Sequence, residues 1–255
     1  VLRPQDLDQY IPSLRLKMPA FISPVSNEDS VQTIENRMFH RSFKGVIDFV
    51  ARYGYYHLVR WLTRCVINTG ITPNTHTIMS ILCVWLASPF LWVGWIGTGL
   101  TLAWLGVILD SVDGKLARLR LHLSDSMGKF EHFAAAPGLA LWLLSVGWYL
   151  SDGKFSTGSS ETFSTISLIL LFVLDKICSG LFRHYAGKEL FDYERIDAIF
   201  HLFAARRNIA LVTFSIGALW GCLAQSFTLF LGLMAVTFVV HISRAGWILK
   251  KKIIG

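Results

Sequence analysis

The chain has 255 residues, of which 53% are hydrophobic and only 16% are charged, with a net charge of +7 and a mean hydropathy of +0.48. A soluble domain carries about 25% charged residues, so this composition argues against a water-soluble fold and indicates an integral membrane protein. The positive charges lie in clusters between long apolar runs. We therefore expect them to set the membrane orientation and to attract anionic lipids, and we expect no nucleic-acid partner.

Two different segments precede the first apolar run. Residues 1–41 form a polar N-terminal segment, or the end of an upstream domain, in which prolines at positions 4, 12, 19 and 24 interrupt a helix. Residues 42–70 place apolar and aromatic side chains at nearly helical spacing beside basic ones, which is typical of an amphipathic juxtamembrane helix in the membrane interface. The chain then turns into the first span, where Thr72 or Pro73 suits a helix start.

Residues 71–255 are predicted to form an all-α, polytopic membrane domain with about six transmembrane helices. A bilayer core of about 30 Å requires about 20 apolar residues per helix. The candidate spans are Thr77–Ile96, Leu100–Asp110 with a few residues beyond it, Phe133–Leu150, Phe163–Leu181, Ile209–Ser226 and Leu229–Ile248. Residues 97–99 are predicted to be the loop of the first hairpin, and residues 151–162 a loop on the same side.

Basic residues gather on one side of these spans. They occur over residues 115–120, 176–207 and 250–252, whereas the loops of the other side contain only Lys154. By the positive-inside rule the basic side is cytoplasmic. We therefore expect a multi-pass protein of the cell inner (plasma) membrane with both termini in the cytoplasm.

Chemistry-bearing residues gather at the inner end of the second predicted span. Asp110 and Asp113 are three residues apart, so they share one helix face. Ionisable groups at this depth are costly and usually face a cavity, a partner or a metal, and hard cations such as Mg²⁺ prefer carboxylate oxygens. Gly114 and Ala117 leave space for a ligand or a neighbouring helix, and Arg118 can hold a phosphate oxygen. The segment predicts a metal-dependent site for a phosphorylated ligand.

Residues 110–118 resemble the first half of the signature of the CDP-alcohol phosphotransferases, also called CDP-alcohol phosphatidyltransferases. That signature is Asp-x2-Asp-Gly-x2-Ala-Arg-x8-Gly-x3-Asp-x3-Asp, and its first five fixed positions match without a gap. The resemblance extends over residues 41–248. It implies six helices, a homodimer, two divalent ions (Mg²⁺ or Mn²⁺) held by the acidic residues, and a CDP-linked donor beside them.

Two further segments are similar to parts of the same family. The run Thr72-Pro73-Asn74 resembles the family's Pro-Asn entry to the first span, which implies a role for Asn74 in binding the donor. The run Ala205-Arg206-Arg207-Asn208 resembles the basic segment of the branch that uses inositol phosphate. Arg183, Arg206 and Arg207 are therefore predicted to contact the phosphate of an acidic acceptor, although Arg183 also suits a simple charge at a helix end.

The second half of the signature departs from the family pattern. Counting eight residues after Arg118 puts Met127 at the Gly position, Glu131 at the third acidic position and Ala135 at the fourth. Glu131 followed by His132 resembles the Asp-His pair of some members, which supports this register, and a shift by one residue also lacks the last acid. In the family this acid is the general base on the acceptor hydroxyl. Glu131 can still bind a metal, but Ala135 can neither bind a metal nor accept a proton.

Three explanations account for Ala135. It is an engineered substitution that traps substrate, or the natural residue of a member in which His132 or Asp125 is the base, or the mark of a non-catalytic member.

The expected function is displacement of CMP from a CDP-alcohol by an acceptor alcohol, which gives a phosphodiester lipid. The donor is CDP-diacylglycerol-like or CDP-inositol-like, the acceptor is free or phosphorylated, and the chain is inactive as given if Ala135 replaces the base. Asp110, Asp113 and Glu131 would hold the metal. A CDP-lipid-binding scaffold or partner subunit is the alternative. A transporter or channel would need polar residues at mid-membrane depth in several spans, which this sequence lacks.

Overall fold

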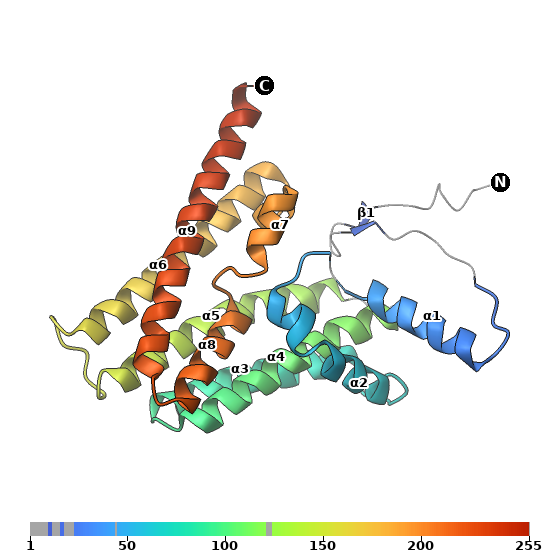
Figure 1. Cartoon of the computed structure of the whole chain (residues 1–255), viewed down its shortest axis with the longest axis horizontal. Helices are drawn as coiled ribbons and strands as arrows, with labels where there is room; N and C mark the ends of the chain where they lie inside the picture. The colour runs from blue at the N-terminus through green and yellow to red at the C-terminus, as the bar shows by residue number, and fades with distance from the viewer. Residues whose placement is uncertain (1–9, 12–15, 18–22, 44, 121–123, 255) are drawn as a thin grey trace.

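The computed structural model describes residues 10–11, 16–17, 23–43, 45–120 and 124–254. Over these ranges the regular secondary structure is helical apart from one antiparallel pair of two-residue strands, β1 (Tyr10–Ile11) and β2 (Leu16–Lys17) (Figure 1). The expected all-α fold is therefore confirmed.

The apolar part of the chain forms a series of long helices. They are α3 (Pro73–Trp92), α4 (Ile96–Leu119), α5 (Asp125–Leu150), α6 (Ser160–Ala186), α8 (Arg207–Leu219) and α9 (Leu223–Ile254), with η3 (Leu190–Asp192) and α7 (Arg195–His201) between α6 and α8. In the described part of the chain, five of them, α3 to α6 and α9, are long and apolar enough to cross a membrane. Their outward faces expose large apolar side chains such as Leu82, Leu170 and Val239. A polytopic membrane protein is the architecture that suits such faces.

Helix α8 is shorter than the span expected over Ile209–Ser226. It ends at Leu219 after 13 residues, which at 1.5 Å per residue is about 20 Å and falls short of the roughly 30 Å hydrocarbon core. Gly221, with a φ of 67°, turns the chain directly into α9. The apolar run therefore continues in sequence across a turn, and one expected span comprises a short helix and the start of the next.

The N-terminal region contains a helix that the proline pattern did not predict. Helix α1 (Glu28–Arg41) begins after Pro24, so no proline interrupts its hydrogen-bond ladder. Asn27 and Ser30 form a reciprocal capping box, because Ser30 N–H donates to Asn27 Oδ1 and Asn27 N–H donates to Ser30 Oγ. The expectation that prolines prevent a helix in residues 1–41 is wrong over this stretch.

The amphipathic segment over residues 42–70 is not one continuous helix. It contains a π-helical turn, η2 (Val50–Gly54), followed by α2 (Tyr56–Val66), and Tyr55 joins them with φ −117° and ψ 17°. The break turns the Tyr55 ring inward, edge-on to Trp104 of α4 with 6.3 Å between ring centroids. Helix α2 nevertheless keeps Leu58 and Trp61 exposed, as an interfacial helix requires.

Helices α3 and α4 form a close antiparallel hairpin (Figure 1). Residues 97–99, which were expected to be its loop, instead lie in the first turn of α4. Gly99 in this turn and Gly106 further along α4 serve packing, because a Cβ on Gly99 would lie 2.6 Å from the Leu91 side chain and one on Gly106 would lie 3.0 Å from the Ser80 carbonyl oxygen. Ser80 Oγ also donates to the Gly106 carbonyl oxygen at 2.7 Å. Small residues thus allow the two backbones to approach closely.

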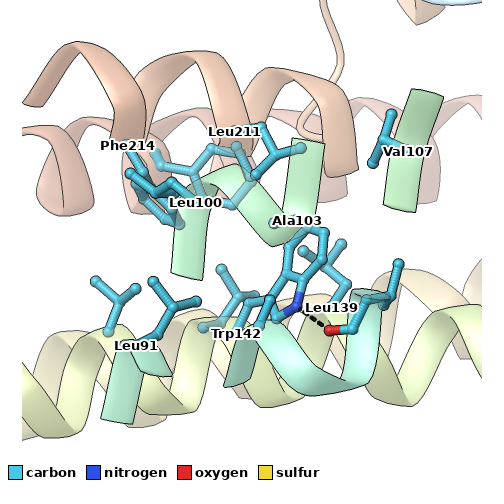
Figure 2. Packing of buried hydrophobic residues seen from close by; sticks show 14 of the residues in the cluster. Leu91, Leu100, Ala103, Val107, Leu139, Trp142, Leu211 and Phe214 are labelled. Carbon is cyan, nitrogen blue, oxygen red and sulfur yellow. Dashed lines mark hydrogen bonds between the residues drawn. The ribbon is translucent and has the colours of Figure 1, made fainter. Parts of the chain in front are cut away.

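The core surrounds this hairpin, with α5 packed against α3 and α8 packed against α4. Figure 2 shows Leu100 of α4 beside Leu211 and Phe214 of α8. Trp142 of α5 is buried, and its Nε1 donates to the Val84 carbonyl oxygen of α3 at 2.7 Å. Helices α6 and α9 lie side by side (Figure 1) and join the rest through α5 and α8.

The two ends of the helix bundle differ in chemistry. Where α3 and α5 end, Trp92 stacks on Trp148 with 4.5 Å between ring centroids, and Phe155 packs edge-on against Trp148. Aromatic rings of this kind are typical of a membrane–water interface. The opposite end, where α3, α5 and α8 begin and α4 finishes, carries the acidic motif.

Candidate active site

The three predicted metal ligands meet where α4 leaves the bundle and α5 enters it. Asp110 and Asp113 lie in the second half of α4, and Glu131 lies early in α5. One carboxylate oxygen from each lies within 4.8 Å of the others. Three carboxylates at this separation repel one another unless cations lie beside them, and an all-oxygen set of donors suits Mg²⁺ or Mn²⁺.

Asp113 provides the test of whether this set fits a metal ion. Only 3% of its surface is exposed, and its Oδ2 atom has no hydrogen-bond partner among the described residues. A buried carboxylate oxygen without a partner is costly, whereas a divalent cation would satisfy it. Thr77 of α3 lies against the same carboxylate. The residues present therefore fit a divalent ion.

Arg207 joins a distant part of the chain to this cluster. It is the first residue of α8 and lies 97 positions after Asp110, yet its Nη2 donates to Asp110 Oδ2 in a largely buried ion pair. The contact offsets part of the negative charge of the acids. It also places a guanidinium, which suits phosphate oxygens, beside the carboxylates that fit a metal.

The remaining motif residues line the same end of the bundle. Arg118 Nε donates to the Ser42 carbonyl oxygen at 2.5 Å, and the guanidinium folds back over Gly114, whose Cβ would lie 3.2 Å from Nη2. The space that Gly114 leaves is therefore taken by Arg118 itself. Ala117 is half-buried on the next turn, and Asn74 is half-buried in the first turn of α3. All four residues lie at the end of the bundle that carries the acids.

Two predicted phosphate ligands have other partners. Arg206 lies with its Nη1 3.1 Å from His201 Nε2, and its guanidinium is 5.5 Å from the centre of the Phe191 ring. Arg183 pairs with Glu189 at 3.3 Å on an exposed surface. The adjacent residues Arg206 and Arg207 thus diverge, since Arg207 pairs with Asp110 whereas Arg206 lies beside His201 and Phe191.

Ala135 lies one helical turn after Glu131 on α5, so the two positions share a face. Ala135 is half-buried and offers no proton acceptor. The backbones of His132 and Asp125 belong to α5, but both side chains lie outside the described residues. The position expected to hold the last acid therefore lies one turn from Glu131 and carries a side chain without polar atoms.

A buried polar network beside the motif was not predicted. Asn208 Nδ2 donates to the Tyr55 hydroxyl at 3.0 Å and to Asp48 Oδ2 at 2.7 Å, and Ser111 Oγ donates to the same hydroxyl at 3.3 Å. Burial raises the pKa of Tyr55 well above its ordinary value, so the hydroxyl stays neutral. Ser111 directly follows Asp110 and Asn208 directly follows Arg207, so their place beside predicted site residues could have indicated both. No feature of the sequence indicated that Tyr55 and Asp48 would join this network.

Comparison with known proteins agrees with this site. The family model described as CDP-alcohol phosphatidyltransferase matches residues 70–240, which is about two thirds of the 255 residues and includes the three acids and Arg207. No curated protein matches the chain. Members of the family are membrane transferases that use CDP-alcohol donors, alcohol acceptors and a divalent metal. The chain belongs to the CDP-alcohol phosphatidyltransferase family.

Proposed function

We propose that this protein is a metal-dependent transferase that displaces CMP from a CDP-alcohol by an acceptor alcohol and so forms a phosphodiester lipid. The acidic cluster carries the proposal. Its three carboxylates lie within 4.8 Å of one another inside the region that matches the family, and one of their oxygens is buried without a partner among the described residues.

The residues of the cluster divide the work by their chemistry. Asp110, Asp113 and Glu131 would hold one or two divalent ions, Mg²⁺ or Mn²⁺, and such ions neutralise the charge of the donor pyrophosphate. Arg118 would hold a phosphate oxygen of the donor, and Arg207 would hold the phosphate of a phosphorylated acceptor, both through charge-assisted hydrogen bonds. The acceptor oxygen bonds to the phosphorus on the alcohol side, the bridging P–O bond breaks, and CMP leaves with the bridging oxygen.

The donor, the acceptor and the setting complete the proposal. The donor is CDP-diacylglycerol-like or CDP-inositol-like, and the pair Arg206-Arg207 favours an acceptor from the branch that uses inositol phosphate. Arg207 supports this assignment more directly than Arg206 or Arg183, because it lies beside the acids. The protein is a homodimer in the plasma membrane, with both termini and the acidic end of the bundle in the cytoplasm.

Ala135 sets the expected level of activity. The transfer requires a base for the acceptor proton, and losing a general base commonly costs on the order of 10²–10⁴ in rate. The donor site, which lies on other residues, would survive this loss. The same observation favours a second candidate, a non-catalytic scaffold or partner subunit that binds CDP-lipid.

CMP release from labelled CDP-diacylglycerol, with Mn²⁺ or Mg²⁺ and a panel of alcohols, tests the proposal. Ala135→Asp should raise the rate by about 10² or more while changing donor affinity less, because three carboxylates already face the ions. Bound cations would keep the added carboxylate ionised.

His132→Ala is the matched control. If the parent already turns over, His132→Ala stops it and Ala135→Asp has no effect, the histidine is the base and the assignment of position 135 is wrong. If neither the parent nor Ala135→Asp releases CMP with any acceptor, but both bind the donor in the presence of metal, the scaffold function is favoured over the transferase function.

A further inference from the structure

A cavity lies in the N-terminal region, and none of the three acids of the candidate active site lines it. Its volume is about 480 Å³, which is within the range of small-ligand sites. The residues that give it its chemistry are His40, Phe43, Arg52, Tyr53, Tyr56 and His57. Arg52, Tyr53 and His57 are exposed, so the cavity opens to the outside of the protein.

The described lining of this cavity suits an anion with an apolar body. It contains no acidic side chain, and Arg52 makes no ion pair within the described part of the chain. The walls are aromatic, since the Phe43 ring stacks on Tyr56 with 5.2 Å between centroids and the Arg52 guanidinium lies 5.6 Å from the centre of the Tyr53 ring. His40 Nε2 lies 3.2 Å from the Tyr56 hydroxyl and holds that wall in place. A guanidinium without a carboxylate partner, between such walls, suits a phosphate.

The two helical segments that line the cavity, η2 and α2, also expose apolar side chains. Phe49 and Tyr53 are exposed on η2 and the turn before it, and Leu58 and Trp61 are exposed on α2. Exposed aromatic and aliphatic side chains beside arginines are typical of a segment lying in the membrane interface. Headgroup phosphates occupy that depth, whereas a soluble anion has no need of the apolar surround.

We propose that this cavity binds the phosphate-bearing headgroup of an anionic membrane phospholipid. Arg52 contacts the phosphate, and the aromatic walls pack against the glycerol and the first carbons of the acyl chains.

The cavity is distinct from the candidate active site. Its wall residue Phe43 packs against α4 through Lys115, whose Nζ lies 4.0 Å from the centre of the ring. Lys115 follows Asp113 by two residues, which is about 200° around the helix. Phe43 therefore meets α4 through a residue on a different face of the helix from Asp113, and none of the three acids lines the cavity. Lipid binding there requires neither turnover nor metal, and it does not rest on the proposed function.

The test measures binding of short-chain phosphatidylglycerol, short-chain phosphatidylcholine and inorganic phosphate to the purified full chain in a neutral detergent. Phosphatidylglycerol should bind more tightly than the other two probes. Arg52→Gln should weaken its binding by about tenfold or more, which is the worth of a charged hydrogen bond. Tyr53→Ala should also weaken binding. Because it keeps the charge of Arg52, it provides a second test if Arg52→Gln disturbs the fold. Arg64→Gln is the matched control, because Arg64 carries the same charge on α2, pairs with Glu35 and lies outside the cavity.

Several results would overturn the proposal. Equal weakening by Arg52→Gln and Arg64→Gln would show general electrostatic attraction rather than a site. Equal affinity for inorganic phosphate and phosphatidylglycerol would make the ligand a free anion. Loss of phosphatidylglycerol binding in Asp113→Asn would place the lipid at the acidic cluster. If Asp113→Asn keeps phosphatidylglycerol binding while Arg52→Gln and Tyr53→Ala lose it, the result supports the cavity.

Discussion

Replacing Gly106 with alanine should destabilise the protein by forcing α3 and α4 apart. The new Cβ would lie 2.7 Å from Val84 Cγ2, 3.0 Å from the Ser80 carbonyl oxygen and 3.1 Å from the Val84 amide nitrogen. Favourable contacts between carbon atoms occur at about 3.5–4.0 Å. Two of the three neighbours are backbone atoms that cannot rotate away, so the helices themselves must move.

The size of the effect follows from three contributions. Overpacking costs about 1–3 kcal/mol. Separating the helices also stretches the 2.7 Å hydrogen bond from Ser80 to Gly106, which is worth about 1 kcal/mol. The higher helix propensity of alanine returns about 1 kcal/mol. The free energy of unfolding should therefore fall by about 1–3 kcal/mol.

Thermal unfolding of the purified protein in detergent measures this change, with Gly97→Ala as the matched control. Gly97 lies in the same helix, but a Cβ there meets nothing within 4 Å, so its substitution should leave the melting temperature unchanged or raised. The interpretation of α3–α4 packing is refuted if Gly106→Ala melts with the parent, or if Gly97→Ala is the more damaging of the two.

Two further predictions concern the site and the orientation. Asp113→Asn should lower Mn²⁺ affinity by at least about tenfold and abolish CDP binding without loss of fold, because it removes the charge of a metal ligand while keeping the side-chain shape; calorimetric titration giving the parent's affinity would place the metal elsewhere. Ser156→Cys, in a chain without its four native cysteines, should react with an impermeant maleimide only from the non-cytoplasmic side, and labelling from the cytoplasmic side alone would invert the topology.

The sequence alone was sufficient for the membrane class, the approximate helices and the clustering of the acids. Long apolar runs specify spans because a bilayer core admits only backbones whose hydrogen bonds are satisfied internally. Asp110 and Asp113 share a face because they are three residues apart on a helix. Glu131 was assigned to the same set through the family spacing, and the structure brings its carboxylate within 4.8 Å of theirs.

Other features depended on contacts between residues far apart in sequence. The break at Tyr55 exists because its ring packs against α4 and its hydroxyl meets Asn208, 153 positions away. Residues 97–99 have the composition of a loop but lie in a helix, in which Gly99 packs against Leu91 of α3. Arg206 and Arg207 are adjacent in sequence and have the same side chain, yet Arg207 pairs with Asp110 and Arg206 lies beside His201, because the start of α8 directs the two side chains to different neighbours. The periodicity of a segment does not specify which distant residue a side chain will contact, because that contact depends on how the helices pack against one another.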